Sequence, residues 1–163
     1  MKFQSTEQAL RFSFNISERV EYTRMDLLKV RETDGSDALS PTDLHAQAAM
    51  IHNQVCRLCE VERNSIFAQY AKGNVRSNAI RELAGYLYPL LAGGLPNKET
   101  VQIVICHWAT RRPSIRMIAQ ECAVSYRTAC RWRSAVLQVW MPLQLRAVGT
   151  LDDYFSQSKN KIA

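Results

Sequence analysis

The residues best suited to chemistry in this sequence are two arginines spaced four apart, Arg127 and Arg131. On an α-helix this spacing places both side chains on one face. An arginine guanidinium can donate two parallel hydrogen bonds to a phosphate group or to the edge of a guanine base. The pair therefore predicts contact with an anionic partner, and nucleic acid is the partner whose chemistry fits it.

Positive charge is concentrated around these two residues. The 163-residue chain has 21 Lys and Arg against 15 Asp and Glu, which gives a formal net charge of +6. Residues 111–146 contain seven arginines and a single acidic residue, Glu121, whereas the rest of the chain has 14 basic and 14 acidic residues. The whole excess thus lies in one short segment. This distribution favours a nucleic-acid contact over a merely solvated basic face.

Residues 114–133 match two helices that are joined by a tight turn, with Ser125 as the cap of the second helix. The apolar pattern agrees: Ile118, Cys122, Ala129 and Trp132 would face inward, small Ala119 would lie at the helix crossing, Ala123 stands where such turns favour glycine, and Val124 would be buried in the turn. The segment therefore predicts a helix-turn-helix. A helical hairpin that only resembles the motif is the alternative.

In a helix-turn-helix, the start of the second helix enters the major groove of double-stranded DNA. The predicted outward face of this helix carries Tyr126, Arg127, Cys130 and Arg131, with Ser134 as a further candidate. Base contacts are expected from Ser125, Tyr126, Arg127 and Arg131, the first two to a methyl group or a phosphate, and phosphate contacts from Arg111, Arg112, Arg116, Thr128 and Arg133.

Helix signals recur through the rest of the chain. Ser5 and Gln8 form a capping box, and Ser40-Pro41-Thr42-Asp43 is a strong helix start. After it, apolar residues follow at spacings of four and three: Leu44, Ala48, Ile51, Val55 and Leu58. This stripe predicts a helix of roughly twenty residues that faces a core, with a protein–protein seam as the alternative.

Further helices are expected to begin at Ser65 and Ser77. The strongest break is 92–96, which reads AGGLP. Asn97 would cap the next helix, with Val101, Val104, Ile105 and Trp108 on one face, and that helix would end at Arg111-Arg112-Pro113. Together these signals predict an all-α fold.

The same signals suggest four regions. Residues 1–39 form an N-terminal helix and a polar connector, whose order from 20 to 39 the sequence leaves open. Residues 40–94 form a helical body, 97–146 the C-terminal helix-turn-helix module, and 147–163 a tail. No signal peptide or membrane-spanning run is expected, so we predict a soluble protein of the cytoplasm.

Other chemistries receive less support. His52, Cys56 and Cys59 would share one side of a continuous helix and could bind zinc, but buried free cysteines are the better interpretation, and we expect neither metal nor cofactor. The histidines and carboxylates are scattered, and no serine or cysteine lies in a nucleophile motif. An enzyme is therefore not expected.

The opening Met1–Phe12, MKFQSTEQALRF, followed by a helical body and a C-terminal helix-turn-helix, resembles the Q antitermination proteins of lambdoid phages, specifically the short zinc-free type of phage 21. The resemblance implies binding to a DNA element beside a late promoter, loading onto paused bacterial RNA polymerase, and suppression of pausing and termination. It also implies that residues 40–94 bind the polymerase and form a ring at the RNA exit channel, through which nascent RNA passes. The implied location is the cytoplasm of the bacterial host.

The sequence is also compatible with two other functions. A conventional dimeric repressor or activator would place a second copy of the chain on DNA and would recognise a palindromic operator. An adaptor protein would bind nucleic acid through its basic segment without sequence preference, and its affinity would fall steeply with salt.

Overall fold

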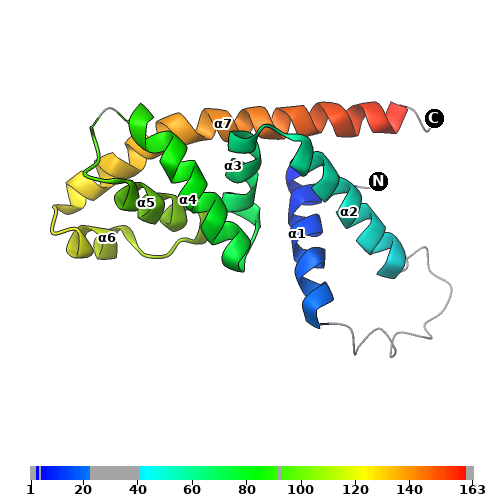
Figure 1. Ribbon diagram of the computed structural model, residues 1–163, viewed down its shortest axis with the longest axis horizontal. Helices are drawn as coiled ribbons and strands as arrows, with labels where there is room; N and C mark the ends of the chain where they lie inside the picture. Colours follow the sequence, from blue (N-terminus) through cyan, green and yellow to red (C-terminus); the bar gives the residue numbers. More distant parts are fainter. Residues whose placement is uncertain (1–2, 4, 23–40, 92, 161–163) are drawn as a thin grey trace. The chain divides into compact units, whose positions relative to one another are not determined.

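The computed structural model describes residues 3, 5–22, 41–91 and 93–160 (Figure 1). All regular structure in these residues is helical, which confirms the all-α prediction. None of the described helices is long and apolar enough to cross a membrane. The helices are α1 Thr6–Tyr22, α2 Pro41–Arg57, α3 Glu60–Tyr70, α4 Gly73–Leu90, α5 Lys98–Thr110, α6 Ile115–Glu121 and α7 Tyr126–Asn160. Residues 23–40, which include most of the predicted connector and the predicted cap Ser40, lie outside the described residues.

The chain divides into two compact units. The smaller unit comprises Met1–Arg57 and Leu151–Ala163, and the larger unit comprises Leu58–Thr150. This division differs from the boundary predicted after residue 94, since α4 and α5 on either side of that break contribute to one hydrophobic core. Leu95 within the break is itself buried in that core, which explains why the glycines there turn the chain without separating two modules.

In the smaller unit, α1 packs against α2. The N-terminus of α1 is capped as predicted, because Ser5 Oγ accepts a hydrogen bond from the Gln8 N–H at 3.2 Å. The apolar stripe of α2 is core-facing as expected: Ala48, Ile51 and Val55 are buried, and Leu44 is half-buried. The interpretation of this stripe as an ordinary core face is therefore confirmed, although α2 ends at Arg57, before Leu58.

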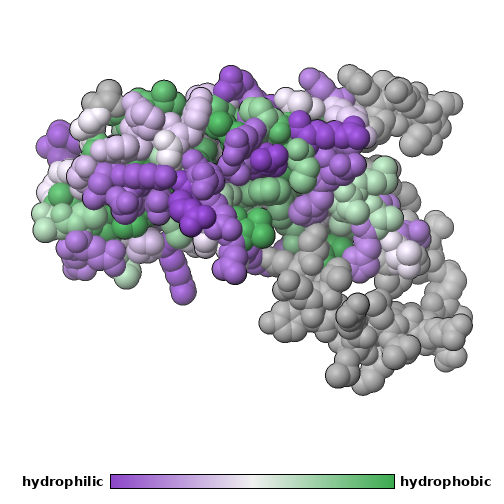
Figure 2. Space-filling model, in the orientation of Figure 1, coloured by the Kyte–Doolittle hydropathy of each residue, from purple (hydrophilic) through white to green (hydrophobic). Residues whose placement is uncertain are grey.

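The larger unit is built from α3, α4, α5, α6 and most of α7. Its main core draws on four of these helices, with α3 and α4 in direct contact. The buried residues of this core include Ala68, Leu83, Leu87, Val101, Val104, Ile105, Trp132, Val136 and Trp140. Figure 2 shows that hydrophilic side chains cover much of the visible face of this unit and that hydrophobic ones are exposed only in small areas between them.

Two predicted helix starts are wrong. α3 begins at Glu60 and not at Ser65. Ser65 is instead buried in the middle of the helix, where its hydroxyl accepts a hydrogen bond from Trp140. α4 begins at Gly73 rather than at Ser77, whose hydroxyl instead donates to the carbonyl of Gly73 at 3.2 Å. Both serines thus bond as helix-interior residues rather than as caps.

The segment predicted as a C-terminal tail is largely helical. α7 continues from Tyr126 to Asn160, so residues 147–160 extend this helix. Ala147 and Leu151 are buried, which shows that the helix keeps an inward face beyond the predicted boundary.

Candidate functional site

A short connection positions α6 after α5. Asn97 caps α5 as predicted, since its Oδ1 accepts from the Thr100 N–H at 2.8 Å. The helix ends at Thr110, where the sequence placed its end, and Arg111 adopts a left-handed conformation with φ 62°. His107 Nδ1 then donates to the Pro113 carbonyl at 2.7 Å, which ties the connection back to α5.

The turn between α6 and α7 is held by local hydrogen bonds. Ala123 takes the left-handed conformation with φ 52°, at the position where the sequence pattern favours glycine. The Val124 N–H donates to the Ala119 carbonyl at 2.9 Å, and this bond closes the end of α6. Ser125 Oγ accepts from the Thr128 N–H at 3.1 Å, so the predicted cap of α7 is present.

A small hydrophobic cluster holds the two helices together. Its buried members are Ile115, Ile118 and Ala119 from α6 and Ala129 from α7. Cys122, Val124, Cys130 and the α5 residue Ile103 pack against it and are partly buried. The predicted inward positions Ile118, Ala129 and Trp132 are confirmed. Cys122 is only half-buried, and so is Val124, which was expected to be buried in the turn.

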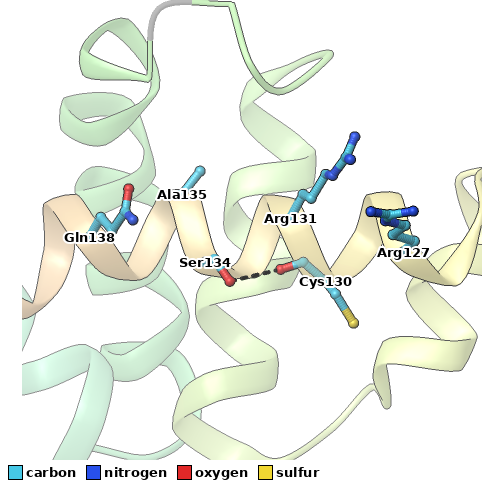
Figure 3. A pocket seen from close by; sticks show the side chains of 6 residues that line it. All are labelled: Arg127, Cys130, Arg131, Ser134, Ala135 and Gln138. Atoms are coloured by element: carbon cyan, nitrogen blue, oxygen red, sulfur yellow. Dashed lines mark hydrogen bonds between the residues drawn. The ribbon is translucent and has the colours of Figure 1, made fainter.

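The opposite face of α7 carries the paired arginines. Each helical residue turns by about 100°, so Arg127 and Arg131 lie opposite the side on which Trp132 and Val136 are buried. Both arginines are exposed and line a shallow hollow of about 360 Å³ (Figure 3). The complete lining comprises Arg127, Cys130, Arg131, Ser134, Ala135 and Gln138, all from α7.

The remaining predicted base contacts have different surroundings. Tyr126 is exposed over 57% of its surface, at the first residue of α7. Ser125 is exposed, but its hydroxyl is engaged by the Thr128 N–H and lies 2.9 Å from Thr128 Oγ1. Cys130, expected on the outward face, is half-buried and packs against the α6–α7 cluster while it lines the hollow.

The predicted phosphate contacts fall into two groups. Arg111, Arg112 and Arg116 are exposed, and the Arg111 guanidinium lies over the Trp108 ring at 4.9 Å from the ring centre. Arg133 and Thr128 are half-buried. The Nε of Arg133 is buried and has no hydrogen-bond partner within the described part of the chain.

The site is cationic because almost no carboxylate accompanies its arginines. Arg146 is paired, with its Nε 3.8 Å from Glu62 Oε1 in the same unit. Arg127 and Arg131 have no ion-pair partner among the residues that the structure describes. Their charges are thus available to an external anion.

Among the described residues, no group of three His, Cys, Asp or Glu side chains could hold a metal ion. The zinc alternative assumed one continuous helix through His52, Cys56 and Cys59, but α2 ends at Arg57. His52 instead packs on Phe14, with 4.4 Å between the ring centres. Burial lowers the pKa of His52 from its ordinary value of 6.5, although a hydrogen bond with the Ser13 backbone acts in the opposite direction.

The hollow contains a long polar side chain that the sequence interpretation did not single out, that of Gln138. It lies seven residues after Arg131, which is a two-turn repeat on the same helical face. That spacing could have identified it. The helix-turn-helix pattern directed attention only to the first turns of the second helix.

Comparison with known proteins adds no relative. The chain matches no known protein-family model, and no curated protein has a significantly similar sequence. Support for DNA binding therefore comes from the α6–α7 site itself.

Proposed function

We propose that this chain is a sequence-specific DNA-binding protein in which α6, the turn and the first part of α7 act as a helix-turn-helix. One observation carries the proposal. Arg127 and Arg131 are exposed and without ion-pair partners in the described chain, on the α7 face opposite its buried side and directly after a capped turn. In this arrangement, α7 would enter the major groove and at least one arginine would bind a guanine edge.

The local structure supports this role, because a reading helix must be held rigidly. The Ala129 side chain is fully buried against α6, and α5 covers the back of the cluster through Ile103. Exposed Arg112 and Arg116 flank the start of α6, where they would contact phosphates. The segment thus supplies a fixed helix and cations for the DNA backbone.

We further propose that the DNA-bound protein acts in transcription antitermination. This part of the proposal is supported by the resemblance of Met1–Phe12 and of the order of parts to the Q proteins. Its partners would be a DNA element near a promoter, bacterial RNA polymerase and the nascent RNA, with no cofactor. The alternative is a conventional dimeric repressor or activator, in which a second copy of the chain also binds the DNA.

The DNA-binding proposal is tested with duplexes selected by the full-length chain from a random pool. Arg127→Ala or Arg131→Ala should cost about 1–3 kcal/mol of binding free energy and relax the preference at one base position. Arg112→Ala should weaken binding to all sequences alike. Equal behaviour of the three variants across sequences would refute this assignment of roles.

The antitermination proposal needs a transcription assay with purified bacterial RNA polymerase. The template carries a phage late promoter, its adjacent element and an intrinsic terminator. Read-through that depends on both the element and Arg127 would support the proposal. Unchanged read-through with altered initiation would refute antitermination and support a conventional regulator.

A further inference from the structure

The hollow on α7 extends beyond the residues that a helix-turn-helix normally uses for base reading. It begins at Arg127 and reaches Gln138, eleven residues further along the same helix. That separation is roughly 16 Å along the helix axis. Each residue of a helix turns by about 100° around the helix axis. An arc of about 60° around the axis of α7 therefore contains Arg127, Arg131, Ser134 and Gln138. They form one continuous polar face.

On this face, short side chains lie between long ones. Cys130, Ser134 and Ala135 are small, whereas Arg127, Arg131 and Gln138 carry long side chains (Figure 3). The Ser134 hydroxyl donates to the Cys130 carbonyl at 3.1 Å, so its hydrogen atom is directed toward the helix backbone. Gln138 is therefore the remaining long donor at the far end of the hollow, and it is exposed.

The position of Gln138 determines which part of DNA it would meet. A straight helix diverges from the curved floor of the major groove, so a residue three turns past the first base contact lies near the sugar–phosphate backbone that borders the groove. The side-chain amide of glutamine can donate to a phosphate oxygen. We propose that Gln138 binds a DNA phosphate and, with Arg127 at the other end of the hollow, fixes the position of α7 along the groove. This inference rests on the proposed DNA-binding function.

The outward face changes chemistry after Gln138, which defines the end of the contact. Two turns further on, the same face presents Leu145, which is exposed over 66% of its surface. An aliphatic side chain has no donor for a phosphate. The proposal therefore predicts that DNA contact along this face stops between Gln138 and Leu145.

The test uses the full-length chain and a fluorescent mixed-sequence duplex of about 30 base pairs, because a phosphate contact does not depend on sequence. The salt concentration is about 0.1 M, where the Debye length is about 10 Å. Gln138→Ala removes the donor and should weaken binding roughly tenfold, the value of one hydrogen bond to a charged group. Gln138→Glu keeps the shape but faces the phosphate with a carboxylate, so it should weaken binding more than Gln138→Ala. Gln138 is exposed, and unchanged circular dichroism would verify that both variants fold.

Leu145→Glu is the matched control, because it adds the same charge on the same face two turns beyond Gln138. It should leave the affinity within about twofold of the unaltered chain, since the added charge lies roughly a Debye length farther along the helix. An equal loss for Leu145→Glu and Gln138→Glu would overturn the proposal, because a general charge effect would then suffice. A change in base preference with Gln138→Ala, instead of a uniform loss, would overturn the phosphate assignment as well.

Arg127→Ala separates this inference from the function on which it rests. If the unaltered chain does not bind the duplex, the DNA-binding function itself fails. The same conclusion follows if Arg127→Ala binds the duplex as tightly as the unaltered chain. If Arg127→Ala weakens binding and Gln138→Glu does not, only the role of Gln138 fails.

Discussion

The indole Nε1 of Trp140 donates a hydrogen bond of 2.7 Å to the hydroxyl of Ser65, a residue 75 positions away in the sequence. Both residues are fully buried, so neither group can exchange this partner for water. The bond links α3 to α7 inside the core of the larger unit. It thereby helps to hold the helix that carries the proposed DNA-contact face.

Ser65→Ala should lower the free energy of unfolding by about 1–3 kcal/mol, because the Trp140 N–H is left buried without an acceptor. Urea denaturation followed by tryptophan fluorescence measures this change. Ser77→Ala is the control, since Ser77 is exposed and bonds only within its own helix. Its effect should be under about 0.5 kcal/mol. Similar losses in the two variants would contradict the importance of the Ser65–Trp140 bond.

Ala123→Gly should stabilise the chain by about 1 kcal/mol, because Ala123 is held at φ 52°, where a Cβ atom is strained. The gain is less than the full strain because glycine is also more flexible in the unfolded chain. The same replacement at Ala135, inside α7, should instead destabilise by about 1 kcal/mol. Thermal denaturation of both variants checks the opposite signs, and destabilisation by Ala123→Gly would show that the turn tolerates alanine without strain.

Trp108→Leu should weaken binding to a mixed-sequence duplex about threefold, because the ring that orients the Arg111 guanidinium is lost. The measurement is a double-mutant cycle with Arg111→Ala by fluorescence anisotropy. In the Arg111→Ala background, Trp108→Leu should have no further effect on affinity. The same threefold loss in both backgrounds would show that the ring acts through the fold and not through Arg111.

His52 should make the smaller unit less stable in acid. Its folded pKa lies below the unfolded value of 6.5, chiefly through desolvation, so the unfolded chain binds the proton more readily. The resulting stability is present above pH 6.5 and is lost as the pH falls through the folded pKa. The free energy of unfolding, measured by urea denaturation across this pH range, should therefore depend on pH. His52→Gln should reduce that dependence. An NMR titration that placed the pKa of His52 at or above 6.5 would contradict this prediction.

The sequence by itself determined the features that depend on neighbours three or four residues away. The caps at Ser5, Asn97 and Ser125 form as expected because each side chain bonds to a backbone N–H three residues on. The shared face of Arg127 and Arg131 follows from helical spacing alone. The fold class and the α6–turn–α7 segment were therefore readable from local patterns.

The tertiary structure decided what depends on distant partners. Ser65 resembles a helix cap in the sequence, but Trp140 makes it a buried acceptor in the interior of α3. The break at residues 92–96 resembles a domain boundary, yet burial of Leu95 keeps α4 and α5 in one core. The hollow that ends at Gln138 appears only once α7 is known to continue as one helix past the predicted motif. Local hydrogen-bonding patterns carry no information about such long-range packing, which is set by the apolar surface that distant segments bury together.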